Sequence, residues 1–222
     1  RFASEGVVGA MLATFSRMQP GQTKHEIVEI LRQEEGQRGL LFEYCLITAG
    51  ASLNRAPSDQ RLKEGDIVSL DSGGNYHGYI GDLCRMGYLG DPSAELEDAL
   101  AVVDEIQHAA RVPIKNGAVG GDIFAATHRL TSVSREGRLS FVAHGMGLIA
   151  HEAPRLLSDG PIPYLAPHRD QALEKGMVLS IETTWQHPRL GFIKLEDTVI
   201  VTERGCEGCG DWARGWNRCG GR

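Results

Sequence analysis

The sequence predicts an α/β (α+β) fold of two similar halves in one domain, each half running helix, helix, strand, strand. Two short motifs that occur twice carry this prediction. The segment MQPG (18–21) is echoed by IKNG (114–117), and each glycine stands six positions before an isoleucine. The segment LKEGDIVSLD (62–71) is echoed by LEKGMVLSIE (173–182), and each glycine stands six positions before an acid. Two halves about a pseudo-two-fold axis explain both echoes; chance similarity of two short strands is the alternative.

In the first half, apolar residues at helical spacing predict a helix over residues 3–18. Thr23, with Glu26 three residues on, forms a capping box that begins a second helix ending near residue 35. Apolar runs then predict three strands, with a loop over residues 50–61 after the first: 40–48, 67–70 and 76–84.

The second half repeats this order. A cap at Ser93 begins a helix over residues 93–112, and another helix follows over 122–133. Three strands are expected after them: 139–144, 177–184 and 192–202. We assign residues 1–204 to one domain and 205–222 to a tail that holds six glycines, three cysteines and no periodicity. A zinc site in the tail would lack a fourth ligand at normal spacing, so a flexible tail is favoured.

Composition excludes several classes of protein. The chain of 222 residues has a formal net charge of −6, which argues against a nucleic-acid partner, since such proteins need a basic surface. No apolar run reaches the ~18 residues of a membrane span. Five cysteines are an odd and sparse set, which fits the reducing cytoplasm better than a disulfide scaffold.

Four acids occupy symmetric places in the two halves. Asp71 and Glu182 each end an apolar strand, and a second acid follows each of them by 11 or 14 residues, at Asp82 and Glu196. A hairpin centred between residues 76 and 77 places the first pair directly opposite each other, where like charges repel unless they share a cation. Ordinary strand-end or turn acids are the alternative for any one of them.

His144 follows the apolar run LSFVA and precedes a Gly-Met-Gly segment. A histidine near a strand end is often structural, but beside four acids an imidazole suits a transition metal. Two divalent cations would neutralise the four carboxylates. Such an oxygen-rich site suits manganese, cobalt, iron or zinc, and two ions that share a water generate hydroxide and polarise a carbonyl. The expected ligands are Asp71, Asp82, His144, Glu182 and Glu196.

Four stretches resemble the pita-bread metallopeptidases, which include methionine aminopeptidase, aminopeptidase P, prolidase and the related creatinase. The stretches are LDSGGNYHGYIGDLCR (70–85), AHGMGLIAHEAP (143–154), LSIETTW (179–185) and KLEDTVIVTE (194–203). The resemblance spans residues 2–203 and implies a pita-bread fold, with the two halves around a curved antiparallel sheet. The short spacing from Glu182 to Glu196 is similar to the prolidase and aminopeptidase P branch. Members of that branch usually carry an extra N-terminal domain, so a catalytic-domain fragment or a truncated relative is expected.

The resemblance implies a role for each ligand. Asp82 and Glu196 bridge both ions, whereas Asp71 contacts one ion and His144 the other. Glu182 is a ligand and also the general base for the metal-bound water. The implied cofactors are two divalent ions, with manganese or cobalt placed before zinc or iron.

The resemblance also implies roles around the ligands. His151 hydrogen-bonds the scissile carbonyl or the developing oxyanion. Relatives place a substrate-contacting histidine in the loop before the first ligand strand, where this chain has Asn54. The arginine two residues before the last ligand is Lys194 here, which keeps the charge but loses the planar fork. We therefore treat Asn54 and Lys194 as substrate-binding candidates.

The resulting prediction is a dinuclear-metal hydrolase that resembles Xaa-Pro aminopeptidases and dipeptidases and cleaves short peptides. The missing loop histidine keeps open a metal-dependent lyase or a creatinase-like hydrolase acting on a small metabolite. A non-catalytic pita-bread binding module is the third interpretation. We expect a short peptide or small-molecule substrate, a homodimer, a cytoplasmic location, and neither a nucleic-acid nor a membrane partner.

Overall fold

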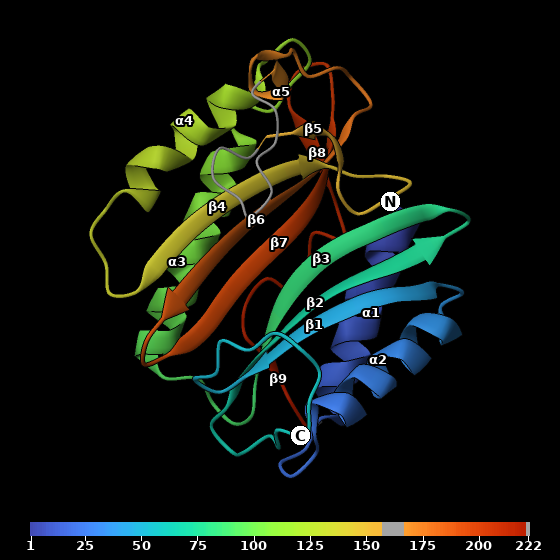
Figure 1. The fold of residues 1–222 in the computed structure, drawn as a ribbon, viewed down its shortest axis with the longest axis vertical. Coiled ribbons are helices and arrows are strands. Elements are labelled where there is room, and N and C mark those ends of the chain that lie inside the picture. The colour runs from blue at the N-terminus through green and yellow to red at the C-terminus, as the bar shows by residue number, and fades with distance from the viewer. Residues whose placement is uncertain (157–166, 221–222) are drawn as a thin grey trace.

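The computed structural model describes residues 1–156 and 167–220, in which one curved sheet is covered by helices (Figure 1). The helices are α1 (Phe2–Arg17), α2 (Lys24–Gln37), α3 (Ala94–Arg111), α4 (Gly120–Thr131) and α5 (Pro167–Asp170). The strands are β1 (Leu41–Ala49), β2 (Ile67–Tyr76), β3 (Tyr79–Tyr88), β4 (Arg138–Gly145), β5 (Glu152–Arg155), β6 (Val178–His187), β7 (Gly191–Val201), β8 (Cys206–Cys209) and β9 (Asn217–Arg218). No helix in the described residues combines the length and apolar content that crossing a membrane requires.

The main path of the sheet runs β1-β2-β3-β7-β6-β4-β5, with each strand antiparallel to its neighbours. Helices α1 and α2 contact strands β1–β3, and α3 and α4 contact β4, β6 and β7 (Figure 1). The two halves of the chain therefore meet where β3 pairs with β7. This architecture confirms the predicted fold of two helix-helix-strand-strand halves.

The echoed motifs make equivalent hydrogen bonds in the two halves. The Gly21 N–H donates to the Leu62 carbonyl at 2.8 Å, and the Gly117 N–H donates to the Leu173 carbonyl at 2.8 Å. Positive φ angles of 82–93° explain why glycine stands at all four motif positions: Gly21, Gly65, Gly117 and Gly176. The echoes are thus a structural repeat, and chance similarity is excluded.

Local sequence signals account for the helices of the first half. Thr23 accepts a hydrogen bond from the Glu26 N–H, and the Glu26 carboxylate accepts one from the Thr23 N–H, so the capping box is present. Helix α1 lies directly on β3 because a glycine leaves room for it. A Cβ at Gly81 would stand 2.4 Å from the backbone nitrogen of Ser4.

The register of the β2–β3 hairpin differs from the prediction by one position. The turn is His77-Gly78, both with positive φ, so the pairing is centred between residues 77 and 78. Asp71 consequently faces Cys84, and the predicted direct pairing of Asp71 with Asp82 is wrong. Glycine at the second turn position favours this two-residue turn. The two acids still share one face of the sheet, because 71 and 73 share a face and residue 73 is paired with 82.

The tail is part of the sheet, which corrects the expectation of a flexible segment without regular structure. Strand β8 pairs with β7 and strand β9 pairs with β3, on either side of the junction between the halves. The reason is polar bonding that periodicity does not reveal. The buried Arg85 guanidinium of β3 donates to the carbonyls of Gly210 and Trp212. Among the described residues, the groups able to hold a metal include no tail cysteine.

A buried ion cluster around Asp197 of β7 joins the tail to α3 and β3. Its carboxylate lies 3.0 Å from Arg85 and 3.1 Å from Arg111, and it also accepts a hydrogen bond from Arg214 of the tail. Burial alone raises the pKa of Asp197, but the three arginines outweigh burial and hold the pKa well below its usual range. The carboxylate is therefore ionised and compensates several buried positive charges.

We expect Asp197→Asn to lower the free energy of unfolding by about 3–5 kcal/mol, because it leaves buried guanidinium groups uncompensated. Urea denaturation followed by circular dichroism measures this change. Asp91→Asn is the matched control, since the Asp91–Arg218 pair is exposed and should contribute less than about 1 kcal/mol. Equal effects of the two substitutions would contradict the role given to the cluster.

A second buried acid, Glu35 of α2, lies behind β2. It is fully buried and accepts a hydrogen bond from Ser72 at 2.9 Å. Burial raises its pKa from 4.5 to about 8. Because the folded chain then binds a proton that the unfolded chain releases, this group stabilises the fold below pH 4.5, and that contribution is lost as the pH rises to about 8.

We therefore expect Glu35→Gln to be more stable than the wild type at pH 8, by on the order of a few kcal/mol, and nearly equal to it at pH 5. Thermal unfolding across this pH range measures the difference. Glu29→Gln, at an exposed position on the same helix, should change neither value. A constant difference between wild type and Glu35→Gln at all pH values would show that Glu35 does not titrate as described.

Candidate metal centre

The five expected metal ligands lie on five consecutive strands, in the order β2, β3, β7, β6, β4. In that order they are Asp71, Asp82, Glu196, Glu182 and His144. Residues adjacent to them in sequence contact the helices. Ser72 donates to Glu35 of α2, and Asp197 accepts from Gln107 of α3. Because side chains alternate along a strand, the ligands lie on the opposite face of the sheet from the helices.

Three groups of possible ligand atoms each lie within 4.8 Å of one another: Asp71, Asp82 and Glu196; His144, Glu182 and Glu196; and Asp82, His144 and His151. Asp82, Glu196 and His144 each belong to two groups, and the first two are the residues expected to bridge two ions. We name the first group the Asp71 position and the second the His144 position. The two positions are neighbours, because they share Glu196.

Glu182 and Glu196 are directly opposite each other in the β6–β7 ladder. Burial raises the pKa of Glu196 to about 7, and the facing Glu182 carboxylate adds to that effect. Burial acts on Glu182 in the same direction, but Lys194 and His144 outweigh it and hold the pKa of Glu182 below its usual range. Glu182 is therefore ionised at neutral pH, while Glu196 retains a proton part of the time in the absence of a metal.

Lys194 lies among the five expected ligands, which we call the set. It precedes Glu196 by two residues on β7 and so shares its face, and its side chain is only 3% exposed. The ammonium contacts three carboxylates at 2.5, 2.6 and 2.7 Å: those of Asp71, Glu182 and Glu196. Burial lowers its pKa, but these acids outweigh burial and raise it well above the usual value. The sequence suggests that Lys194 meets substrate, whereas the structure places its charge among the expected metal ligands.

Two buried polar atoms of the expected ligands lack a hydrogen-bond partner among the residues that the structure describes: His144 Nε2 and Asp82 Oδ1. His144 Nδ1 lies 3.0 Å from the Gly145 carbonyl, which fixes the ring and directs Nε2 toward Glu182, 3.6 Å away. Burial raises the pKa of Asp82 well above its usual range, and the Glu196 carboxylate adds to this. A divalent cation would bind the unpartnered atoms, and it would displace the protons that the buried acids hold. The residues therefore fit a divalent cation.

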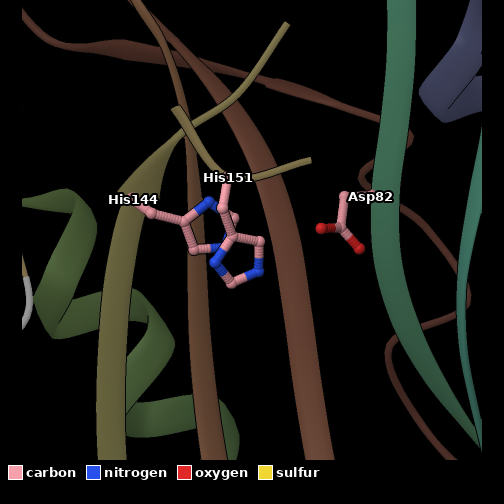
Figure 2. A group of neighbouring side chains, drawn as sticks. All are labelled: Asp82, His144 and His151. Atoms are coloured by element: carbon pink, nitrogen blue, oxygen red, sulfur yellow. The ribbon is translucent and has the colours of Figure 1, made fainter. Parts of the chain in front are cut away.

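His151 reaches the same place from the turn between β4 and β5 (Figure 2). Its ring stacks on that of His144, with centroids 3.9 Å apart and an interplanar angle of 15°. In Figure 2 the Asp82 carboxylate projects from β3 toward the two rings. Unlike His144, the His151 side chain is exposed, so it can meet a molecule that enters from solvent.

Glycine shapes the loop that presents His151. A Cβ at Gly145 would stand 2.1 Å from the Ala153 carbonyl, and one at Gly147 would stand 2.4 Å from the Glu152 carboxylate. The Gly147 carbonyl in turn accepts a hydrogen bond from the Ile80 N–H of β3, at 2.8 Å. The two glycines of the Gly-Met-Gly segment thus permit close approach, and the Ile80–Gly147 hydrogen bond ties the His151 loop to the first half.

Asn54 stands in the loop before β2, and its side chain is exposed. Its carboxamide oxygen accepts a hydrogen bond from the Ala56 N–H at 3.0 Å, and its backbone carbonyl accepts one from the buried Lys24 at 2.7 Å. No described contact joins Asn54 to the five ligands. The next residue, Arg55, does reach the set, because its guanidinium pairs with Asp71 and lies over the Phe192 ring.

Sequence reasoning did not single out Arg55 or Ser180, which donates to Glu196 at 2.7 Å. Ser180 carries a usable signal, because it precedes Glu182 by two residues on one strand and therefore shares its face. Arg55 carries none, since nothing in its loop sequence shows that it folds back on Asp71.

Comparison with known proteins agrees with this geometry. The profile of metallopeptidase family M24 matches residues 1–203. The Xaa-Pro dipeptidase of Pyrococcus furiosus is 27% identical over 205 residues, covering 89% of this chain and 56% of that protein. The probable dipeptidase PepE of Mycobacterium tuberculosis is 33% identical over 159 residues, covering 70% of this chain and 40% of that protein. This chain thus spans about half the length of the curated relatives it matches.

The fold has a solved counterpart in an X-Pro aminopeptidase from Thermotoga maritima, with a TM-score of 0.87 at 24% identity. The match covers 97% of this chain and 61% of that one. Together with the curved antiparallel sheet, this confirms the pita-bread fold. Since the family profile extends over nearly all of the sequence, the chain belongs to metallopeptidase family M24.

Proposed function

We propose that this chain is the catalytic part of a metal-dependent Xaa-Pro exopeptidase that acts on short peptides. One observation carries the proposal: five side chains from five consecutive strands converge, and two of their buried donor atoms have no partner among the described residues. Relatives described as Xaa-Pro dipeptidase and X-Pro aminopeptidase support the peptide class. We assign the catalytic domain to residues 1–204, with the tail completing its sheet through β8 and β9.

The set offers two positions for divalent ions, which is the basis for expecting a dinuclear hydrolase. Divalent ions in such a site supply Lewis-acid polarisation of a carbonyl and activation of water. Manganese or cobalt is proposed before zinc or iron, because oxygen donors outnumber nitrogen donors. A homodimer and a cytoplasmic location belong to the same proposal and rest on the sequence.

The chain's own residues supply the remaining steps. Glu182 is ionised at neutral pH and accepts a proton from the attacking water. His151, exposed at the edge of the set, donates a hydrogen bond to the oxygen on which negative charge develops. The loop that carries Asn54 and Arg55 borders the Asp71 position and is the proposed contact for the rest of the substrate.

The second candidate function is a metal-dependent lyase or creatinase-like hydrolase acting on a small metabolite. Asn54 favours it, because an amide donates hydrogen bonds but carries no proton charge at pH 7, unlike the histidine expected in peptidase relatives. Asn54→His should raise Xaa-Pro cleavage if the peptide pocket is intact. No change in Asn54→His, together with turnover of a non-peptide metabolite by the wild type, would favour the second candidate.

The experiment is a substrate panel on the chain stripped of metal by a chelator and then reloaded with Mn²⁺ or Co²⁺. The panel contains Xaa-Pro dipeptides, Xaa-Pro-Yaa tripeptides, matched Xaa-Ala peptides and small non-peptide substrates. We expect cleavage of the proline peptides only after reloading, and little cleavage of the alanine peptides. Metal binding without turnover of any peptide would contradict the peptidase proposal.

A further inference from the structure

We propose that the ammonium of Lys194 takes the place of one of the two metal ions, so that each chain binds a single divalent ion, at the His144 position. This inference rests on the proposed metal site but not on the identity of the substrate. The four carboxylates alone suggest two metal ions, and this inference lowers that count to one.

The first argument is the place of the ammonium. Lys194 reaches Asp71 at 2.5 Å and Glu196 at 2.7 Å, and these are two of the three residues of the Asp71 position. Its third contact is Glu182, at 2.6 Å. An ammonium has three N–H donors, so all three are used on carboxylates from three strands. A cation is therefore already bound to both Asp71 and Glu196. Because it also contacts Glu182 and Glu196 of the His144 position, the individual oxygen atoms that it contacts decide between the two positions.

The second argument is the difference between the two positions. Lys194 contacts the Oε2 atoms of Glu182 and Glu196, whereas the Oε1 atoms lie 3.6 and 3.9 Å from His144 Nε2. Within the described part of the chain, that nitrogen has no hydrogen-bond partner. An ion at the His144 position can thus bind without moving Lys194. At the Asp71 position, by contrast, Arg55 pairs with the same Asp71 oxygen as Lys194.

The third argument is charge. Once a bound ion has displaced their protons, the four carboxylates carry −4, and the side chains of Lys194 and Arg55 return +2. One divalent ion makes the buried set neutral, whereas a second would leave a surplus of +2. A surplus charge in a buried site is costly, and expelling Lys194 would leave its ammonium without a partner. We therefore expect any second ion to bind at least about 100-fold more weakly than the first.

Mn²⁺ binding to the 222-residue chain tests this count. Equilibrium dialysis with metal analysis should give one tightly bound ion in the wild type and two in Lys194→Met, which removes the charge and keeps a flexible side chain. Lys175→Met, at an exposed lysine, is the matched control and should keep a count of one. Electron paramagnetic resonance of the wild type should show isolated Mn²⁺ rather than a spin-coupled pair.

The wild-type measurements do not depend on whether Lys194→Met folds. Two ions of similar affinity in the wild type, or a spin-coupled pair at low Mn²⁺, would overturn the inference. No bound Mn²⁺ would overturn it together with the metal site. A chain that binds one ion but cleaves no Xaa-Pro peptide would support this inference and contradict only the substrate proposal.

Discussion

Glu196→Gln is expected to abolish tight metal binding and to reduce kcat to the level of the metal-free chain. Glu196 belongs to both candidate positions and is 2% exposed, so bulk solvent does not reach it to compensate for a lost carboxylate. An amide offers one neutral oxygen in place of a carboxylate. Because loss of an outer hydrogen-bond partner already costs 10–100-fold in metal affinity, we expect loss of this ligand to exceed about 100-fold.

Calorimetric titration with Mn²⁺ and a proline-peptide assay measure the two effects of Glu196→Gln. The fold should be kept, because the amide still accepts a hydrogen bond from Ser180 and the apolar clusters lie elsewhere. Glu207→Gln on β8 is the matched control at an exposed position. Unchanged Mn²⁺ affinity in Glu196→Gln would refute its assignment as a ligand.

His151→Ala is expected to lower kcat by on the order of 10²–10³ while KM changes little. The proposed hydrogen bond forms to charge that develops during the reaction, so it contributes little to binding the ground state. Steady-state kinetics on an Xaa-Pro dipeptide separates the two parameters, and metal analysis of the same sample provides the control. Metal content should be unchanged, because His144 is the expected imidazole ligand. If the variant loses its metal, His151 is the ligand instead, which its stacking on His144 makes geometrically feasible.

The sequence could predict the fold and the convergence of the ligands because both depend on local, repeated signals. The echoed glycines mark equivalent turns, and the acids six positions after two of them, Asp71 and Glu182, stand at the same place in the equivalent strands β2 and β6. Both strands continue for five residues beyond the acid, so the expectation that each acid ends its strand is wrong. Period-two alternation then determines which residues share a face, as for Lys194 and Glu196. These inferences need no knowledge of distances between side chains.

Other features depended on tertiary contacts that no local pattern encodes. The hairpin register was wrong by one position because the turn could be centred on either side of His77, and only the Gly78 backbone decides it. The sequence favours a flexible tail because the tail has no periodicity. Its bonds to Arg85 join residues more than a hundred positions apart, and its bond to Asp197 comes from within that aperiodic segment. Counting charge from acids alone also missed Arg55, whose loop folds back on Asp71.

The most direct test of the metal centre is anomalous diffraction from crystals of the chain grown with Mn²⁺. We predict an anomalous peak at about 2.0–2.3 Å from His144 Nε2 and from oxygens of Glu182 and Glu196. A peak that lies only elsewhere in the molecule, or these side chains turned away from any common centre, would contradict the account.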